Sequence, residues 1–250
     1  MCIRLLSRGP LEQISGGYLY NRYLIEFLRE AGADVAYHGV PPDPRSLVAS
    51  DVLVVDSLVV GEMATRLLTS PAEIVLLLHM LPDMAGPGSA GRALFEALCR
   101  RSRLIVTGKS TLTLLRRAIA DPSLEAVTIE PGVPDYWLAK ARYAPSARSL
   151  LGIANYVRGK GLLRMIDVLC ELRDLPWTLT LHGNDELDPA YFDAVSRSVE
   201  SRGLMERVEL AGPIPHAAVN VKMLESDLLV HFSARESYSM VTAEAIVAGL

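Results

Sequence analysis

The stretch ESYSMVTAE, residues 236–244, carries two glutamates, Glu236 and Glu244, eight positions apart. It follows the apolar run DLLVHFS (227–233), which predicts a buried strand, and it precedes a helical pattern that begins near Ser239. We therefore expect Glu236 in a strand-to-helix loop and Glu244 just beyond the first turn of the helix. Two acids in such places are most often solvated surface charges, so the spacing alone leaves that interpretation open.

The helix start between these acids offers a second interpretation. Backbone N–H groups at the start of a helix lack partners within the helix, and together with the positive end of the helix dipole they bind phosphate. An acid inside the helix can accept hydrogen bonds from a ribose diol, and an acid in the loop can do so from sugar hydroxyls. Diphosphate, ribose and sugar together make a nucleotide sugar. The amides concerned are those of Tyr238, Ser239, Met240 and Val241.

Short β-rich runs that alternate with helical patterns must position these groups. Several of the runs are apolar on both faces, as in parallel strands that are covered on both sides. The predicted strands are 2–7, 34–38, 51–56, 74–79, 103–108, 126–130, 150–155, 177–183, 207–212 and 227–233. The predicted helices are approximately 17–31, 88–101, 109–120, 160–173, 188–202 and 239–249.

The alternation predicts an α/β fold with doubly wound parallel sheets. Residues 131–147 contain three prolines without a clear period, which is typical of a linker. We expect two Rossmann-like domains facing a cleft, an N-terminal domain at 1–140 and a C-terminal domain at 141–250. Ligands of such folds bind at the carboxyl ends of the strands.

The composition and several incomplete motifs narrow the range of possible functions. A net charge of −4 gives no reason to expect nucleic acid as a partner. Three scattered cysteines, no signal peptide and no long apolar run favour a soluble cytoplasmic chain. VTGKST lacks the first glycine of a P-loop because Arg103 takes its place, and Pro87 takes the first glycine's place of a nucleophile elbow around Ser89. The five histidines have no metal-binding spacing, so no metal and no cofactor are expected.

The chain resembles the retaining glycosyltransferases of family 4, which have the GT-B fold, over nearly its whole length. ESYSMVTAE fits the Glu-x7-Glu motif of that family, and NYVRGKGLLRMIDVL (155–169) resembles the segment that opens its second domain. SGGYLYNRYLIEFLREAGADV (15–35) resembles its N-terminal glycine loop and helix, and IEPGVPDYW (129–137) resembles the end of its first domain.

The resemblance implies a role for each matching residue. Glu236 would contact hydroxyls of the donor sugar, Glu244 would hold the ribose, and the helix-start amides would hold the diphosphate. Lys160 would neutralise the departing phosphate, whose charge grows in the transition state. His79, after the run IVLLL, resembles a histidine placed over the reacting sugar; a structural role is equally open. Gly16 and Gly17 would let the backbone approach the diphosphate or the acceptor, unless they form only a helix-entry turn.

Two features depart from the family pattern. The family commonly has an arginine five residues before the lysine, and here that position is Asn155, with Arg158 close by. The family also continues beyond Gly249, so we expect a truncated chain with an incomplete second domain. Both features keep a non-catalytic nucleotide-sugar binding or scaffold protein as the alternative. An epimerase or phosphorylase of similar fold would carry other motifs.

The implied reaction moves a hexose from a donor such as a UDP- or GDP-hexose to an acceptor hydroxyl, with retention and without a metal. The acceptor, a sugar, a lipid or a small metabolite, is not identified by any motif. A basic face in the first domain could meet anionic lipids at the inner membrane surface, although solvated helix surface explains it as well. Its residues are Arg100, Arg101, Arg103, Lys109, Arg116 and Arg117.

Overall fold

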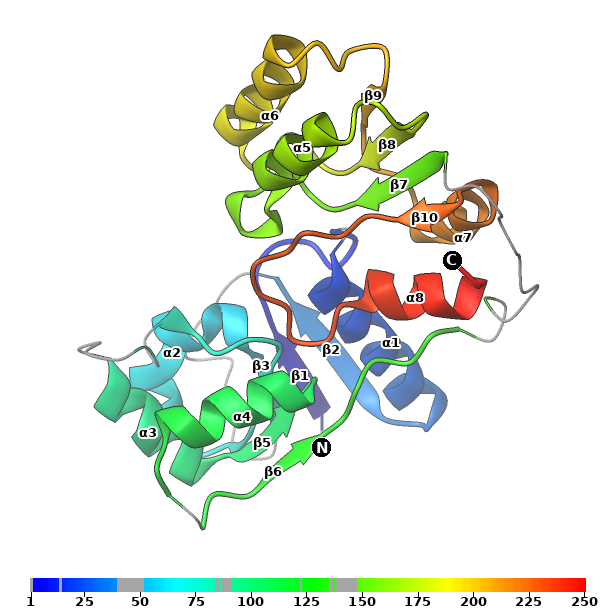
Figure 1. The fold of residues 1–250 in the computed structure, drawn as a ribbon. Helices are drawn as coiled ribbons and strands as arrows, with labels where there is room; N and C mark the ends of the chain where they lie inside the picture. The colour runs from blue at the N-terminus through cyan, green and yellow to red at the C-terminus, as the bar shows by residue number, and fades with distance from the viewer. Residues whose placement is uncertain are drawn as a thin grey trace. The chain divides into compact units, whose positions relative to one another are not determined.

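The computed structural model describes residues 2–13, 15–39, 52–83, 86, 91–121, 123–134, 137 and 148–250. By its contacts the chain divides into two compact units (Figure 1). The first comprises Met1–Gln13 and Gly17–Pro131, and the second comprises Ile14–Gly16 and Gly132–Leu250. The boundary expected from the sequence, between residues 140 and 141, lies outside the described residues.

The first unit is built on a six-stranded parallel sheet with the order β2-β1-β3-β4-β5-β6. The order reverses between β1 and β3, so the connections leave these two strands in opposite directions and open a crevice at their carboxyl ends. Its strands are β1 (Cys2–Leu6), β2 (Asp34–His38), β3 (Val52–Asp56), β4 (Glu73–Leu78), β5 (Arg103–Val106) and β6 (Ala126–Thr128).

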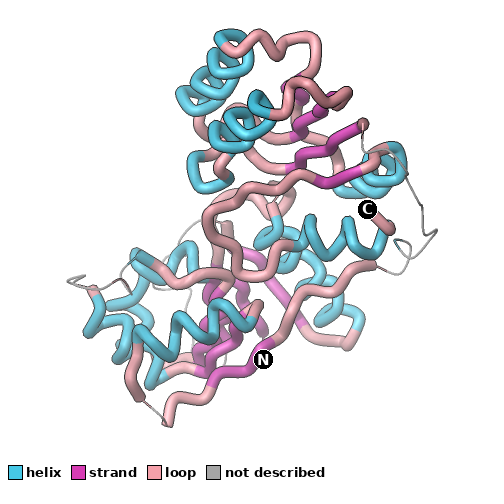
Figure 2. Tube along the Cα trace, viewed as in Figure 1, coloured by secondary structure: helices cyan, strands magenta, loops and turns pink. Residues whose placement is uncertain are grey.

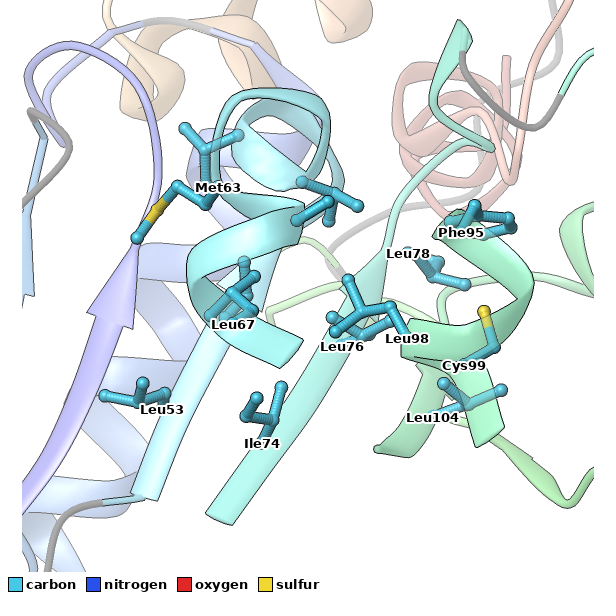
Figure 3. Packing of buried hydrophobic residues seen from close by; sticks show 14 of the residues in the cluster. Leu53, Met63, Leu67, Ile74, Leu76, Leu78, Phe95, Leu98, Cys99 and Leu104 are labelled. Carbon is cyan, nitrogen blue, oxygen red and sulfur yellow. The ribbon is translucent and has the colours of Figure 1, made fainter. Parts of the chain in front are cut away.

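Helices cover both faces of this sheet because successive strand residues point to opposite sides. Leu53 and Val55 pack with the helices of one face, whereas Val54 packs with Tyr20 and Ile25 of the helix on the other face. Figure 3 shows the first of these clusters, in which leucines of the strands meet Met63 and Phe95. The helices are α1 (Gly16–Glu30) on one face and α2 (Ser57–Thr69), α3 (Arg92–Arg101) and α4 (Lys109–Ala118) on the other.

The second unit has a four-stranded parallel sheet with the order β10-β7-β8-β9 (Figure 2). Here the order reverses between β7 and β10. Leu150 packs against α5 and α6, while its neighbour Leu151 packs against α7 and α8 on the opposite face. The elements are β7 (Ser149–Ile153), α5 (Leu162–Glu171), β8 (Thr178–His182), α6 (Pro189–Ser201), β9 (Val208–Ala211), α7 (His216–Glu225), β10 (Leu228–Leu229) and α8 (Met240–Ala248).

The α/β, doubly wound prediction is confirmed, with differences in detail. Helices α2 and α7 were not expected from the sequence. The buried strand expected at 227–233 is wrong in length and burial, because only Leu228 and Leu229 pair with β7 and Leu228 is 45% exposed. After Val230 the chain leaves the sheet, and the Ala234 amide donates to the Gly159 carbonyl instead. No helix within the described residues is long and apolar enough to span a membrane.

Candidate functional site

Lys160 and Glu236 meet at the point where the strand order of the second sheet reverses. Lys160 ends η4 (Arg158–Lys160), a 3-10 turn that follows β7, and Glu236 lies in the loop that follows β10. The Lys160 Nζ lies 2.7 Å from Oε1 of Glu236, and Nε2 of His231 lies 3.3 Å from the same oxygen. Topology therefore gathers two basic side chains and one acid at the position where α/β sheets bind ligands.

Glycine at position 161 makes this approach possible. Gly161 has a φ of 65°, in the left-handed region, and an added Cβ would lie 2.3 Å from the carbonyl oxygen of Phe232. Glycine is the residue that fits such a close contact between two backbones. The Gly159 carbonyl accepts from the Ala234 amide at 3.0 Å, which ties the turn to the loop. Two backbone contacts thus fix the turn that carries Lys160 beside the loop that carries Glu236.

The surroundings of Glu236 keep its carboxylate charged. Burial acts to raise its pKa, but hydrogen bonds from His231, Lys160 and Ser233 together with the charge of Lys160 outweigh burial. The net effect lowers the pKa of Glu236 from 4.5 to about 2. Its side chain is 27% exposed, so its oxygens remain within reach of a hydroxyl-bearing ligand.

The start of α8 has a strained backbone at the residue that precedes the helix. Ser239, which precedes the helix, has φ 70° and ψ 74°, and within the described residues no other non-glycine residue has a positive φ. Its hydroxyl lies 2.7 Å from that of Thr242 and 3.5 Å from Nε2 of His231. The Ser239 carbonyl accepts from the amides of Thr242 and Ala243. The preceding amides, those of Met240 and Val241, have no carbonyl acceptor within the helix, since they form its first turn.

Glu244 lies in α8 as expected, but its side chain is 5% exposed and contacts another side chain of the unit. Its Oε1 lies 2.7 Å from Nε2 of His216, at the start of α7. The His216 ring in turn stacks on Trp137, with centroids 5.3 Å apart. In this structure Glu244 joins α7 to α8, and the ribose role implied by the resemblance stays a prediction.

Asn155 and Arg158 do not place a second cation beside Lys160. The Asn155 Oδ1 accepts from the Asn184 amide at 3.1 Å, so the side chain joins the loops that follow β7 and β8. The Arg158 guanidinium lies over the ring of Tyr191, 5.9 Å from its centroid. Both side chains therefore have structural partners.

His79 belongs to a polar network at the carboxyl edge of the first sheet, and the other members of this network were not predicted from the sequence. The Nε2 of His79 lies 2.9 Å from Oδ1 of Asn21, and the side-chain Nδ2 of Asn21 donates to Asp56 at 2.8 Å. Asp56 also accepts from the Ser7 hydroxyl at 2.8 Å and from the Leu58 amide at 2.9 Å, which caps α2. Ser7, Asp56 and His79 each come at the end of a buried run, and that shared place in the pattern was the available signal.

The network decides how His79 can act. Since the side-chain amide nitrogen of Asn21 donates to Asp56, the Asn21 oxygen faces His79 and accepts from Nε2–H. In the neutral ring Nδ1 is then an acceptor. Burial lowers the pKa of His79 below 6.5, and the nearby Asp56 charge opposes that shift only in part. His79 is thus held neutral, as a hydrogen-bonding group.

The two glycines predicted near the donor lie at the start of α1. Gly17, in the first turn of α1, lies against His79, where an added Cβ would be 3.4 Å from Cδ2 of the ring; Gly16 begins the same helix. In the basic face, Arg100 pairs with Asp121, Arg103 pairs with Glu73 and Arg101 donates to the Ser70 carbonyl. The described part of the chain contains no group of three or more His, Cys, Asp or Glu side chains that could hold a metal ion.

No protein-family model matches this chain, and no curated protein matches it significantly. Several solved structures are similar to this chain in fold. A glycosyltransferase from Rickettsia africae is 12% identical with a TM-score of 0.74, over 99% of this chain and 77% of its own. HepE from Anabaena, solved with UDP and glucose, is 17% identical with a TM-score of 0.72, over 100% and 79%. Sucrose-phosphate synthase from Thermosynechococcus elongatus is 18% identical with a TM-score of 0.78, over 99% and 79%.

The chain has the GT-B fold. At these identities the likeness establishes the fold alone, and the chemistry has to be argued from the side chains that the fold brings together.

Proposed function

We propose that this protein is a glycosyltransferase that takes a hexose from a nucleotide-sugar donor and transfers it to an acceptor hydroxyl. The observation that carries the proposal is the cluster of Lys160, Glu236 and His231 beside the strained start of α8. A cation, an acid and helix-start amides that have no acceptor within the helix, all at the switch point of a parallel sheet, match the phosphate and the hydroxyls of such a donor. HepE, a protein of the same fold, was solved with UDP-glucose.

Each part of the site would contact a different part of the donor. The amides of Ser239, Met240 and Val241, with that of Tyr238, bind the diphosphate at the positive end of the α8 dipole. Glu236 accepts hydrogen bonds from sugar hydroxyls, and its lowered pKa keeps it an acceptor at neutral pH. Lys160 stabilises the charge that builds on the leaving phosphate oxygen as the glycosidic C–O bond breaks, which lowers the barrier selectively.

By the family-4 resemblance, the neutral ring of His79 would accept a hydroxyl hydrogen of the hexose. In the finer form of the proposal, transfer proceeds with retention of the anomeric configuration and without a metal, as in the family-4 enzymes. The acceptor oxygen bonds to the anomeric carbon, the bond from that carbon to the phosphate oxygen breaks, and the acceptor proton passes to the leaving diphosphate. The acceptor is a sugar, a lipid or a small metabolite, and the reaction takes place in the cytoplasm or at its membrane surface.

Ligand-induced stabilisation tests the donor site first. The protein is melted with UDP, GDP and ADP and with their hexose conjugates, where a ligand at a hundred times its Kd stabilises by about 2.7 kcal/mol. We expect one nucleotide series to raise the Tm of the wild type, and we expect transfer or slow hydrolysis of that donor without added metal. A protein that melts cooperatively and responds to none of these ligands would contradict the proposal.

A second candidate function is supported by Asn155 and Arg158. Both hold structural partners, so Lys160 is the one cation that η4 presents to Glu236 in this structure. A protein with this arrangement would bind a nucleotide sugar as a scaffold or carrier without turning it over. Tight donor binding with neither transfer nor hydrolysis, over a panel of sugar, lipid and small-molecule acceptors, would favour this alternative.

A further inference from the structure

The ion pair between Lys160 and Glu236 places a carboxylate where the proposed reaction needs a phosphate. Oε1 of Glu236 is 2.7 Å from the Lys160 Nζ and 3.3 Å from His231 Nε2, so one acid oxygen engages both basic groups of the cluster. Any phosphate that uses Lys160 has to share it with Glu236 or displace it.

In the proposed reaction, substrate and product differ in charge at the phosphate that Lys160 would contact. In a nucleotide sugar the terminal phosphate is esterified to the hexose and carries one negative charge. In the nucleoside diphosphate product that phosphate is free, and its second ionisation, with a pKa of about 6 as in phosphate monoesters, adds further charge near pH 7. The product also lacks the hexose hydroxyls that could donate to Glu236.

We propose that Glu236 determines the preference of this site for the nucleotide sugar over the nucleoside diphosphate. The proposal rests on the proposed function, since it concerns the same donor site. With the donor, Glu236 exchanges part of its contact with Lys160 for hydrogen bonds from the hexose hydroxyls. With the product, Glu236 competes with the free phosphate for Lys160 and repels its additional charge, which promotes product release.

The structure supplies what this role requires. Lys160 Nζ at 2.7 Å and His231 Nε2 at 3.3 Å both contact Oε1 of Glu236, so two side chains hold the carboxylate in place. The contacts that lower its pKa to about 2 also keep it ionised throughout the neutral range. Only 27% of the side chain is exposed, so solvent screens its charge less than it would at the open surface.

The test compares UDP and UDP-glucose, or the corresponding pair for whichever base stabilises the protein, by titration calorimetry. Glu236→Gln keeps the shape and removes the charge. Glu225→Gln is the matched control, because Glu225 is exposed, lies in the same unit and pairs with Lys222 away from this cluster. We expect Glu236→Gln to bind the nucleoside diphosphate about tenfold more tightly, from one close charge removed at an intermediate dielectric, and to lose preference for the nucleotide sugar.

The control should leave the ratio of the two affinities unchanged. A ratio equally unchanged in Glu236→Gln, or weaker binding of the diphosphate, would overturn the inference while leaving the donor site intact. Wild type that binds neither ligand would instead overturn the proposed function.

A measurement on the wild type covers the case in which Glu236→Gln does not fold. The methyl ester of the nucleoside diphosphate removes the extra charge without adding a hexose, so we expect it to bind at least as tightly as the free diphosphate. A clear preference of the wild type for the free diphosphate would contradict the repulsion on which the inference depends.

Discussion

The ammonium of Lys160 lies 2.7 Å from the carboxylate of Glu236, although the two residues are 76 positions apart in the chain. The contact forms because β7 and β10 are neighbours in the sheet and the loops after both strands emerge at the same edge. The same contact therefore belongs both to the packing of the second unit and to the proposed donor site, so substitutions there can change stability, activity or both.

Replacing Lys160 by alanine tests its role in the transition state. We expect Lys160→Ala to lower kcat by about 10²–10³, the range for removing one preorganised electrostatic group, while the donor Kd changes far less. Steady-state kinetics and calorimetry on the same preparation measure the two quantities. Lys222→Ala, which removes another lysine of the second unit that is paired with Glu225, should leave both near the wild-type values. An intact kcat in Lys160→Ala would exclude Lys160 from leaving-group stabilisation.

Replacing Gly161 by alanine tests the backbone contact that positions Lys160. A Cβ at this residue would collide with the Phe232 carbonyl oxygen and would also force a side chain into a left-handed conformation, so we expect a loss of about 1–3 kcal/mol in the free energy of unfolding. Donor affinity should fall as well, because the turn has to move. Gly159→Ala is the matched control: it lies in the same turn, and an added Cβ there meets no atom within 4 Å. Equal urea midpoints for the two variants would refute this account.

Strain at Ser239 predicts an unusual order of stability. Ser239→Ala and Ser239→Gly both lose the hydroxyl contact with Thr242, but only glycine relieves the positive φ. We expect the glycine variant to be more stable than the alanine variant by about 1 kcal/mol, measured by chemical unfolding. The reverse order would mean that Ser239 is not held in the left-handed conformation in solution.

Acid sensitivity should report the surroundings of Glu236. Its pKa falls from 4.5 to about 2 on folding, so the unfolded chain binds the proton more readily and the contribution of Glu236 to stability is complete above about pH 5. That contribution is lost as the pH falls toward 2. We expect the free energy of unfolding of Glu236→Gln to decline less than that of wild type between pH 5 and pH 3. Glu225→Gln should follow the wild-type curve, and parallel curves for all three proteins would contradict the prediction.

Glu244 can be assigned by separating binding from stability. If it holds the ribose, Glu244→Gln should weaken nucleotide binding by about 1.5–3 kcal/mol, the value of a hydrogen bond to a charged group. His216→Gln removes the partner that Glu244 has in this structure and leaves the carboxylate in place. Nucleotide affinity that stays constant in Glu244→Gln, with a lower Tm in both variants, would assign Glu244 to the packing of α7 on α8 alone.

The sequence by itself determined the class of fold and the local setting of the motif. Runs such as DVLVVD and IVLLLH are apolar on both faces, and only strands covered on both sides need such a pattern, so parallel sheets followed. Glu236 in a loop and Glu244 inside a helix also followed from local pattern alone. Helix α2 was missed because Gly61 and the adjacent valines weaken the helical signal, although Val59, Val60, Met63 and Leu67 form a buried stripe.

Only the tertiary structure decided which side chains meet. Strand order and loop paths bring His231 and Lys160 together on Glu236, and they bring His216 to Glu244. They also place Asn21 between Asp56 and His79. No local sequence pattern encodes these contacts. The strand expected at 227–233 ends at Leu229 for the same reason. The Val230 amide still donates to Leu151 of β7, but further along the segment the Ala234 amide donates to Gly159 in the turn before α5, and a long-range contact of this kind outweighs the β propensity of the segment.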